Sequence, residues 1–172
     1  ADELGLRLET IYFGGGTPTS LSSEDLKAIT DAVSANFDMK NVREYTVEAG
    51  RPDTLDEDKL RVLKNAGVGR ISVNPQTFVD SVLKNIGRAH TSEDTVRAFM
   101  KAREIGFDNI NMDLIAGLPG DNPDTFEMSV NKAIELSAEN ITVHTLALKR
   151  ASSLVTEGHI DSVSRDTVEM LS

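Results

Sequence analysis

The sequence predicts an α/β fold in which parallel strands alternate with helices. Five short runs are rich in β-branched and aromatic residues, and longer stretches with the apolar spacing of helices separate them. Helical connections require the strands that they join to be parallel. A closed eight-stranded barrel usually takes ~250 residues. These 172 residues therefore fit part of a (β/α) barrel or a doubly wound sheet.

The five expected strands cover residues 9–13, 44–48, 70–74, 109–115 and 140–146. The first strand runs directly into three glycines and a proline, in the segment I-Y-F-G-G-G-T-P-T of residues 11–19. Glycine allows the left-handed backbone of a tight turn and lets main chain approach a ligand closely. An ordinary strand-to-helix connection uses the same residues, so the motif alone leaves both interpretations open.

Each expected helix has a recognisable start. Ser22 caps the first, with Asp25 three residues further on. Its apolar side chains recur at helical spacing and are expected to face the sheet: Leu26, Ile29 and Val33. The later helices begin at similar capping residues, namely Asp56, Thr91 and Asn122. Gly67 and Gly106 end the second and third helices.

Composition limits the classes of function. The chain is acidic, with a formal net charge of −10 at pH 7, and its basic residues are scattered. We therefore expect no nucleic-acid surface and no membrane surface. No signal-peptide pattern and no long apolar run are present, which makes the protein cytoplasmic by expectation. Residues 1–150 are the expected core, and residues 151–172 are expected to form a C-terminal helix or a mobile tail.

Cysteine is absent, which excludes disulfides and thiolate metal sites within these residues. The histidines are His90, His144 and His159, and they lack the spacing of metal ligands. No metal site is therefore expected in the chain itself.

Polar residues follow the expected strands, where parallel α/β folds bind their ligands. Glu48 ends the second strand, and Asp113 lies within the fourth. Carboxylates in apolar strands are unfavourable unless they are paired or hydrogen-bonded. Gln76 follows the third strand, and Arg88 is a candidate ion-pair partner. We expect one polar site at this end of the sheet; the alternative is that each side chain simply meets solvent.

Five motifs in order resemble those of the radical S-adenosylmethionine enzymes, and more narrowly the oxygen-independent coproporphyrinogen III oxidases (coproporphyrinogen dehydrogenases). They are I-Y-F-G-G-G-T-P-T, T-V-E-A-G-R-P-D, R-I-S-V-N-P-Q-T, Arg88 after Ile86-Gly87, and N-I-N-M-D-L-I-A-G-L-P-G. The resemblance runs from about residue 9 to residue 150. Gly50 and Arg51 depart from the acidic residue and proline common after the matching glutamate, which leaves substrate contacts there open.

The resemblance implies a TIM-barrel-like partial barrel of six strands, of which this chain carries strands two to six. In the family, a C-x-x-x-C-x-x-C loop after strand one holds a 4Fe-4S cluster that binds S-adenosylmethionine. Because this chain has no cysteine, we expect it to be a fragment that lacks the cluster segment and is inactive alone. Its first strand would then have a free edge, through which we expect the fragment to dimerise or aggregate.

The resemblance also implies the residues of the cofactor site. The backbone of the glycine turn is expected to meet the amino group of S-adenosylmethionine, at Gly15, Gly16 and Thr17. Positions that match contacts to the nucleoside or the methionine carboxylate are Glu48, Gln76, Arg88 and Asp113. Ala147 matches a backbone contact near the adenine. A guanidinium suits a carboxylate, and an acidic side chain suits hydroxyl groups or an ammonium.

The implied reaction is reductive cleavage of S-adenosylmethionine to methionine and a 5′-deoxyadenosyl radical. In the family, this radical removes hydrogen from the propionates of coproporphyrinogen III, and loss of carbon dioxide leaves vinyl groups. The expected partner is thus a small tetrapyrrole. Two alternatives stay open: a haem-binding carrier (haem chaperone) on the same barrel, and a non-radical enzyme that holds a phosphate ligand at the glycine turn.

Overall fold

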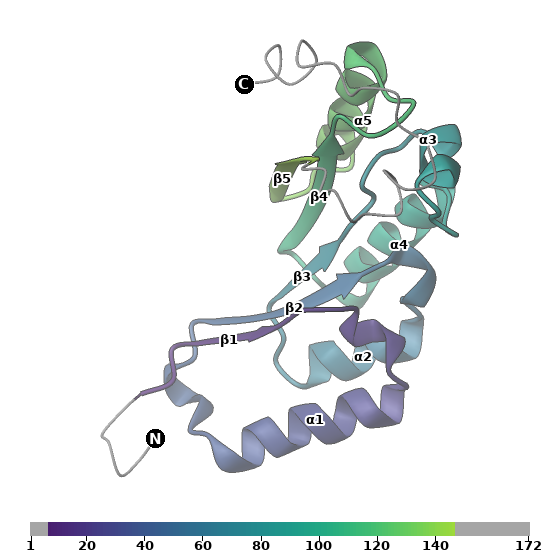
Figure 1. Cartoon of the computed structure of the whole chain (residues 1–172). Helices are drawn as coiled ribbons and strands as arrows, with labels where there is room; N and C mark the ends of the chain where they lie inside the picture. The colour runs from purple at the N-terminus through teal and green to yellow at the C-terminus, as the bar shows by residue number, and fades with distance from the viewer. Residues whose placement is uncertain (1–6, 147–172) are drawn as a thin grey trace.

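The computed structural model describes residues 7–146, which form one parallel sheet with helices packed against it (Figure 1). The strands are β1 Thr10–Phe13, β2 Glu44–Gly50, β3 Arg70–Val73, β4 Ile110–Ala116 and β5 Asn140–Thr145. Their order in the sheet is β1-β2-β3-β4-β5, and every neighbouring pair is parallel. A doubly wound sheet reverses its strand order at a switch point, whereas a barrel adds each strand beside the last. The fold is therefore a partial (β/α) barrel.

Five α-helices connect these strands. They are α1 Ser23–Asn36, α2 Glu57–Asn65, α3 Asp80–Asn85, α4 Ser92–Ile105 and α5 Pro123–Glu135. Short 3-10 turns follow β1 and β2, namely η2 Pro18–Ser20 and η4 Pro52–Thr54, and a third, η3 Met39–Asn41, precedes β2. The turns η2 and η4 lie at the carboxyl ends of their strands, beside the expected site.

The expected helix caps are confirmed. The Ser22 hydroxyl accepts a hydrogen bond from the Asp25 amide at 3.1 Å, and Asp56 caps α2 in the same way. Thr91 and Asp94 exchange reciprocal bonds at the start of α4, which satisfies amide groups that have no partner within the helix. These signals are local in the sequence, which is why the helix starts could be predicted.

Two expectations about the helices are corrected. Helix α3 was not expected between residues 79 and 87; it has fewer than two turns and no side-chain cap, so it gives little periodic signal. Ile29 was expected to face the sheet but is 40% exposed. It lies one turn beyond Leu26, which is 2% exposed, at the margin of the buried face of α1.

The core lies between the sheet and the helices. Alternate residues of each strand enter it, as for Val47, Ile71 and Met112, all with no exposed surface. Phe99 from α4 and Phe107 after it fill the space beneath the strands. No helix in residues 7–146 is both long and apolar enough to cross a membrane. Ala147 and residues 151–172, for which a contact and a tail were expected, lie outside the described residues.

Candidate functional site

The face of the sheet opposite the helices is polar. Residues that alternate with the core positions are Tyr12, Thr46, Glu48, Ser72, Asn111, Asp113, Thr142 and His144. The parallel register places these side chains next to one another, because Tyr12 pairs with Thr46, Glu48 with Ser72, and Asp113 with Thr142. Parallel sheets usually have two apolar faces. A polar face near the carboxyl ends of the strands is therefore the best candidate for a ligand site.

Glu48 is held by both of its carboxylate oxygens. The Tyr12 hydroxyl donates to Oε1, and the Gly15 amide donates to Oε2 at 3.1 Å. The hydrogen bond to Glu48, with smaller contributions from burial and from the charges of Glu48 and Asp113, raises the pKa of Tyr12 from 10.0 to about 12. Tyr12 therefore remains a hydrogen-bond donor throughout the physiological pH range, and the carboxylate has a fixed orientation.

The glycine turn allows this close contact. A Cβ at Gly14 would meet the Tyr12 ring and lie 2.8 Å from Glu48 Oε2, closer than side chains tolerate. Gly15 has a φ of 84°, in the left-handed region, and a Cβ there would meet nothing within 4 Å. The turn thus presents open backbone next to an oriented carboxylate.

The glycine turn also lines a hollow of about 410 Å³. Its apolar wall is formed by Phe13, Leu21, Leu26 and Ile29. The exposed position of Ile29 is explained by this hollow, since the side chain borders an open space between β1 and α1.

Asp113 forms a second polar group on the same face. Its carboxylate accepts a hydrogen bond from Asn111 Nδ2 at 2.6 Å, and His144 Nε2 lies 4.0 Å from its other oxygen. Thr142 donates to Asn111 Oδ1 at 2.9 Å. Asp113 is thereby oriented by neighbours on β4 and β5, in the same way that β1 orients Glu48.

Gln76 extends this site by way of its backbone. Its amide donates to the Asp113 carbonyl at 3.0 Å, and its carbonyl accepts from the Ile115 amide at 2.9 Å. Gln76 has a φ of 67°, a left-handed conformation that is unfavourable for a residue with a side chain and often marks functional sites. The structure therefore brings Gln76 next to Asp113.

Arg88 lies elsewhere on the rim. It is half-buried, and no ion pair to Glu48 or Asp113 is present in the described part of the chain. Burial lowers the pKa of Arg88, Arg51 lowers it further, and Asp53 acts in the opposite direction. The charged groups that act on Arg88 thus belong to the turn that follows β2, and the expected pairing with Glu48 or Asp113 is not formed in the described residues.

Two of the buried polar atoms that lack partners belong to β3 and the residue after it. Ser72 Oγ and Asn74 Oδ1 have no hydrogen bond within residues 7–146. Ser72 is on the same face as Glu48, its register partner, and Asn74 follows β3 at its carboxyl end. Buried polar atoms normally have hydrogen-bond partners. A polar ligand on this face could provide the hydrogen-bond partners that these two atoms lack within the protein.

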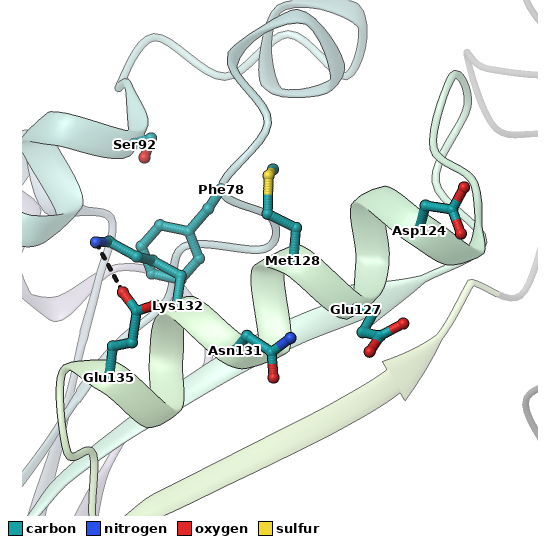
Figure 2. A pocket seen from close by; sticks show the side chains of 8 residues that line it. All are labelled: Phe78, Ser92, Asp124, Glu127, Met128, Asn131, Lys132 and Glu135. Atoms are coloured by element: carbon teal, nitrogen blue, oxygen red, sulfur yellow. Dashed lines mark hydrogen bonds and ion pairs between the residues drawn. The ribbon is translucent and has the colours of Figure 1, made fainter.

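A second hollow is not part of this site. It has about 590 Å³ and lies on the outside of α5, lined by Phe78, Ser92 and side chains of that helix (Figure 2). Lys132 and Glu135 pair across its end at 3.1 Å. No expected site residue lines this hollow, so the polar face remains the candidate.

Three residues of the site were not expected from the sequence: Tyr12, Asn111 and Thr142. Tyr12 donates to Glu48 on the neighbouring strand. Asn111 donates to Asp113, two residues further along β4, and Thr142 on β5 donates to Asn111. The alternation of Tyr12 with Ile11 and Phe13 was the available signal, but the partner could be chosen only with the strand register known.

A one-sided parallel sheet with a polar face and a glycine turn at its strand ends defines a ligand-binding (β/α) barrel. A family model described as the Radical SAM superfamily matches residues 1–133. The chain therefore belongs to the radical SAM superfamily. In structure, it is similar to coproporphyrinogen III oxidase (HemN) from Escherichia coli, with a TM-score of 0.84 and 26% identity over 97% of this chain and 39% of that one.

Two curated relatives from Bacillus subtilis are more similar to the chain in sequence than this HemN structure is. The chain is 48% identical over 158 residues to the oxygen-independent coproporphyrinogen-III oxidase-like protein HemZ, which covers 91% of this chain and 32% of HemZ. It is 46% identical over 143 residues to the heme chaperone HemW, which covers 83% of this chain and 38% of HemW. The chain thus spans about a third of the length of these relatives.

Membership of the superfamily implies S-adenosylmethionine and a 4Fe-4S cluster as cofactors. The described residues fit S-adenosylmethionine, since open glycine backbone, oriented carboxylates and unpartnered buried polar atoms lie on one face. They do not fit the cluster, because the chain has no cysteine. Cysteine ligands would have to lie outside these 172 residues.

Proposed function

We propose that this chain forms the S-adenosylmethionine-binding part of a radical enzyme that oxidatively decarboxylates the propionates of coproporphyrinogen III. The observation that carries the proposal is the Glu48 carboxylate, held between the Gly15 amide and the Tyr12 hydroxyl at the end of the strands. The names of the HemZ-like and HemN relatives supply the substrate class. The activity belongs to the whole protein, of which the chain is one part.

The residues of this chain bind and orient the cofactor in the proposal. Glu48 and Asp113 accept hydrogen bonds from ribose hydroxyls or the ammonium, which suits carboxylates held in fixed orientations. Gly15, Gly16 and Thr17 provide main chain at the amino group, and Gln76 contributes beside Asp113. Arg88 is assigned the methionine carboxylate, for which a guanidinium is suited, and Ala147 a backbone contact to the adenine.

When bound, S-adenosylmethionine and the cluster supply the hydrogen abstraction. In the proposal, the chain's own contribution is to bind and position the cofactor.

A haem chaperone is the second candidate, favoured by the 46% identity to HemW. This value is close to the 48% identity to the HemZ-like relative, so the two relatives support the candidates about equally. The same barrel and carboxylates would suit an oxidase and a haem chaperone. The two functions differ in whether the tetrapyrrole is decarboxylated or only bound.

The test uses the full-length protein with its cluster reconstituted under anaerobic conditions. We expect cleavage of S-adenosylmethionine and conversion of coproporphyrinogen III. Glu48→Gln should weaken S-adenosylmethionine binding about tenfold, which corresponds to ~1.4 kcal/mol. Glu127→Gln is the matched control, since Glu127 lines the outer hollow, and it should leave binding unchanged. Cofactor cleavage without decarboxylation, together with stoichiometric haem binding, would establish the chaperone instead.

A further inference from the structure

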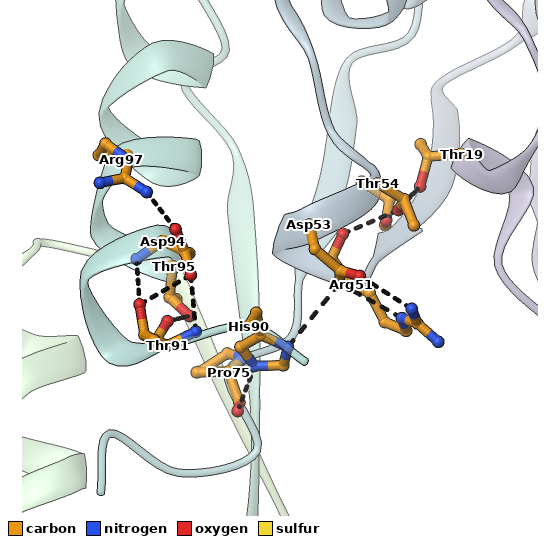
Figure 3. A network of polar contacts seen from close by, with 11 residues as sticks. Thr19, Arg51, Asp53, Thr54, Pro75, His90, Thr91, Asp94, Thr95 and Arg97 are labelled. Carbon is orange, nitrogen blue, oxygen red and sulfur yellow. Dashed lines mark hydrogen bonds and ion pairs between the residues drawn. The ribbon is translucent and has the colours of Figure 1, made fainter. Parts of the chain in front are cut away.

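His90 is a buried histidine that the proposed function does not use. It follows Arg88 by two residues, precedes the capping box of α4, and is 3% exposed (Figure 3). Buried histidines are usually hydrogen-bonded through both ring nitrogens. In this structure, the ring lies between two turns at the carboxyl ends of the strands and is hydrogen-bonded to one of them.

The first contact of His90 is with the turn after β3. Nε2 lies 3.3 Å from the Pro75 carbonyl oxygen. A carbonyl only accepts, so Nε2 carries the proton and the imidazole donates. Pro75 directly precedes Gln76, whose left-handed φ of 67° requires support from its surroundings.

The second contact is with the turn after β2. His90 Nδ1 faces Asp53 Oδ1 at 3.9 Å and has no hydrogen bond within the described residues. Arg51 holds the same carboxylate through Nε at 3.3 Å and Nη2 at 2.8 Å. Burial lowers the pKa of His90 and Arg88 adds to this, while Pro75, Asp53 and Asp94 oppose it. At neutral pH, the ring is therefore neutral.

The polar contacts continue to the turn after β1 (Figure 3). Thr54 donates to the Arg51 carbonyl at 2.8 Å and lies 2.7 Å from the Thr19 hydroxyl. Thr19 in turn donates to the Ala49 carbonyl at 2.5 Å. The turns after β1 and β2 are thus joined by contacts of Thr19 and Thr54, and the His90 ring packs beside them with its one hydrogen bond to the turn after β3.

We propose that His90 is a positioning residue that holds the Pro75–Gln76 peptide in the conformation required to bind S-adenosylmethionine. The proposal rests on the proposed function, because Gln76 is assigned to the cofactor there. His90 does not touch the cofactor; it acts through the Pro75 carbonyl. The backbone of Gln76 then sets the position of Asp113 and Ile115.

The experiment compares His90→Gln with His90→Met in the full-length, cluster-reconstituted protein. The Gln amide nitrogen keeps a donor near the position of Nε2, whereas Met has similar volume and no donor. We expect S-adenosylmethionine affinity by calorimetry within threefold of wild type for Gln and about tenfold weaker for Met. His90→Asn, whose shorter amide does not reach Pro75, replaces His90→Met if that variant does not fold.

Amide hydrogen exchange gives a readout that does not depend on the cofactor. The Gln76 and Ile115 amides should exchange faster in His90→Met than in His90→Gln, while amides in α1 stay unchanged. Equal affinity and equal protection in both variants would overturn the proposal. If the wild type does not bind S-adenosylmethionine, the proposed function fails, yet faster exchange in His90→Met would still show that His90 holds the turn.

Discussion

At the scale of single residues, the site depends on how its carboxylates are oriented. Both oxygens of Glu48 have a donor from β1 or from the turn after it, so the side chain gives up its rotational freedom before a ligand arrives. A site that is ordered in advance loses less entropy on binding. Asp113 is ordered in the same way by Asn111.

The pKa of Tyr12 depends on its hydrogen bond to Glu48. Its pKa of about 12 means that no proton leaves it as pH rises through the ordinary value of 10.0. The folded state binds this proton more tightly than the unfolded state, so the stabilisation is complete below pH 10 and is lost as pH approaches 12.

Near-ultraviolet titration of tyrosinate tests this prediction. Burial also raises the pKa of Tyr45, so neither of these tyrosines should ionise near pH 10 in the folded protein. Glu48→Gln should bring one tyrosine back toward the ordinary value, because the charged acceptor is gone. Tyr12→Phe in the same background should remove that transition. A wild-type tyrosine at position 12 that titrates normally would show that the hydrogen bond does not form.

Much of the site could be predicted at this scale. Glu48, Gln76 and Asp113 stand out because polar residues at the ends of apolar strands have few structural explanations. Tyr12 could not be assigned, since its role depends on the register that sets β1 beside β2. Arg88 was expected to pair with the carboxylates, and no such ion pair is present in the described residues. Its position depends on α3, the short helix before it, which gives little periodic signal.

At the scale of elements, the turns after the strands are fixed to one another by buried hydroxyl groups. Thr19 has no exposed surface, and its hydroxyl joins η2 to the end of β2 and to η4. Lys59 from α2 donates to the carbonyls of Thr19 and Thr54 at 2.8 and 3.0 Å. The glycine turn is therefore anchored on its far side, while its ligand side stays open.

Thr19→Val tests this anchor. Valine keeps the volume and removes the hydroxyl, leaving the Ala49 carbonyl without this donor, and we expect a loss of about 1–3 kcal/mol in unfolding free energy. Thr19→Ser keeps the hydroxyl and should lose less. Ser20→Ala, at the exposed neighbouring position, should stay within ~0.5 kcal/mol of wild type. Urea unfolding measures all of these variants, and equal stabilities for Val and Ser would refute the anchor.

At the scale of the whole molecule, the sheet is covered on one face and bounded by two edge strands in the described residues, β1 and β5. Strand β1 is short, and Tyr12 on it is 59% exposed. Unpaired edge strands offer backbone groups to other chains. Helical connections predicted parallel strands but left two strand orders open, that of a partial barrel and that of a doubly wound sheet. The observed order β1-β2-β3-β4-β5 places β1 at an edge.

We predict that a protein of these 172 residues associates through β1. Its mass by light scattering should rise with concentration. Thr10→Lys places a charge on the edge and should reduce this association, whereas Asn131→Lys, on the exposed side of α5, makes the same change of charge elsewhere and should not. A sharp monomeric mass at all concentrations would contradict the prediction.

The backbone at Gln76 has a consequence for how this protein balances stability against function. A left-handed residue with a side chain is unfavourable by about 1 kcal/mol or more, and glycine would relieve this at once. The chain nevertheless carries glutamine there. Such strain is often found at functional sites, where the surrounding structure holds it. Replacing Gln76 by glycine should therefore make the fold more stable and, in the proposed function, remove a side chain from the cofactor site.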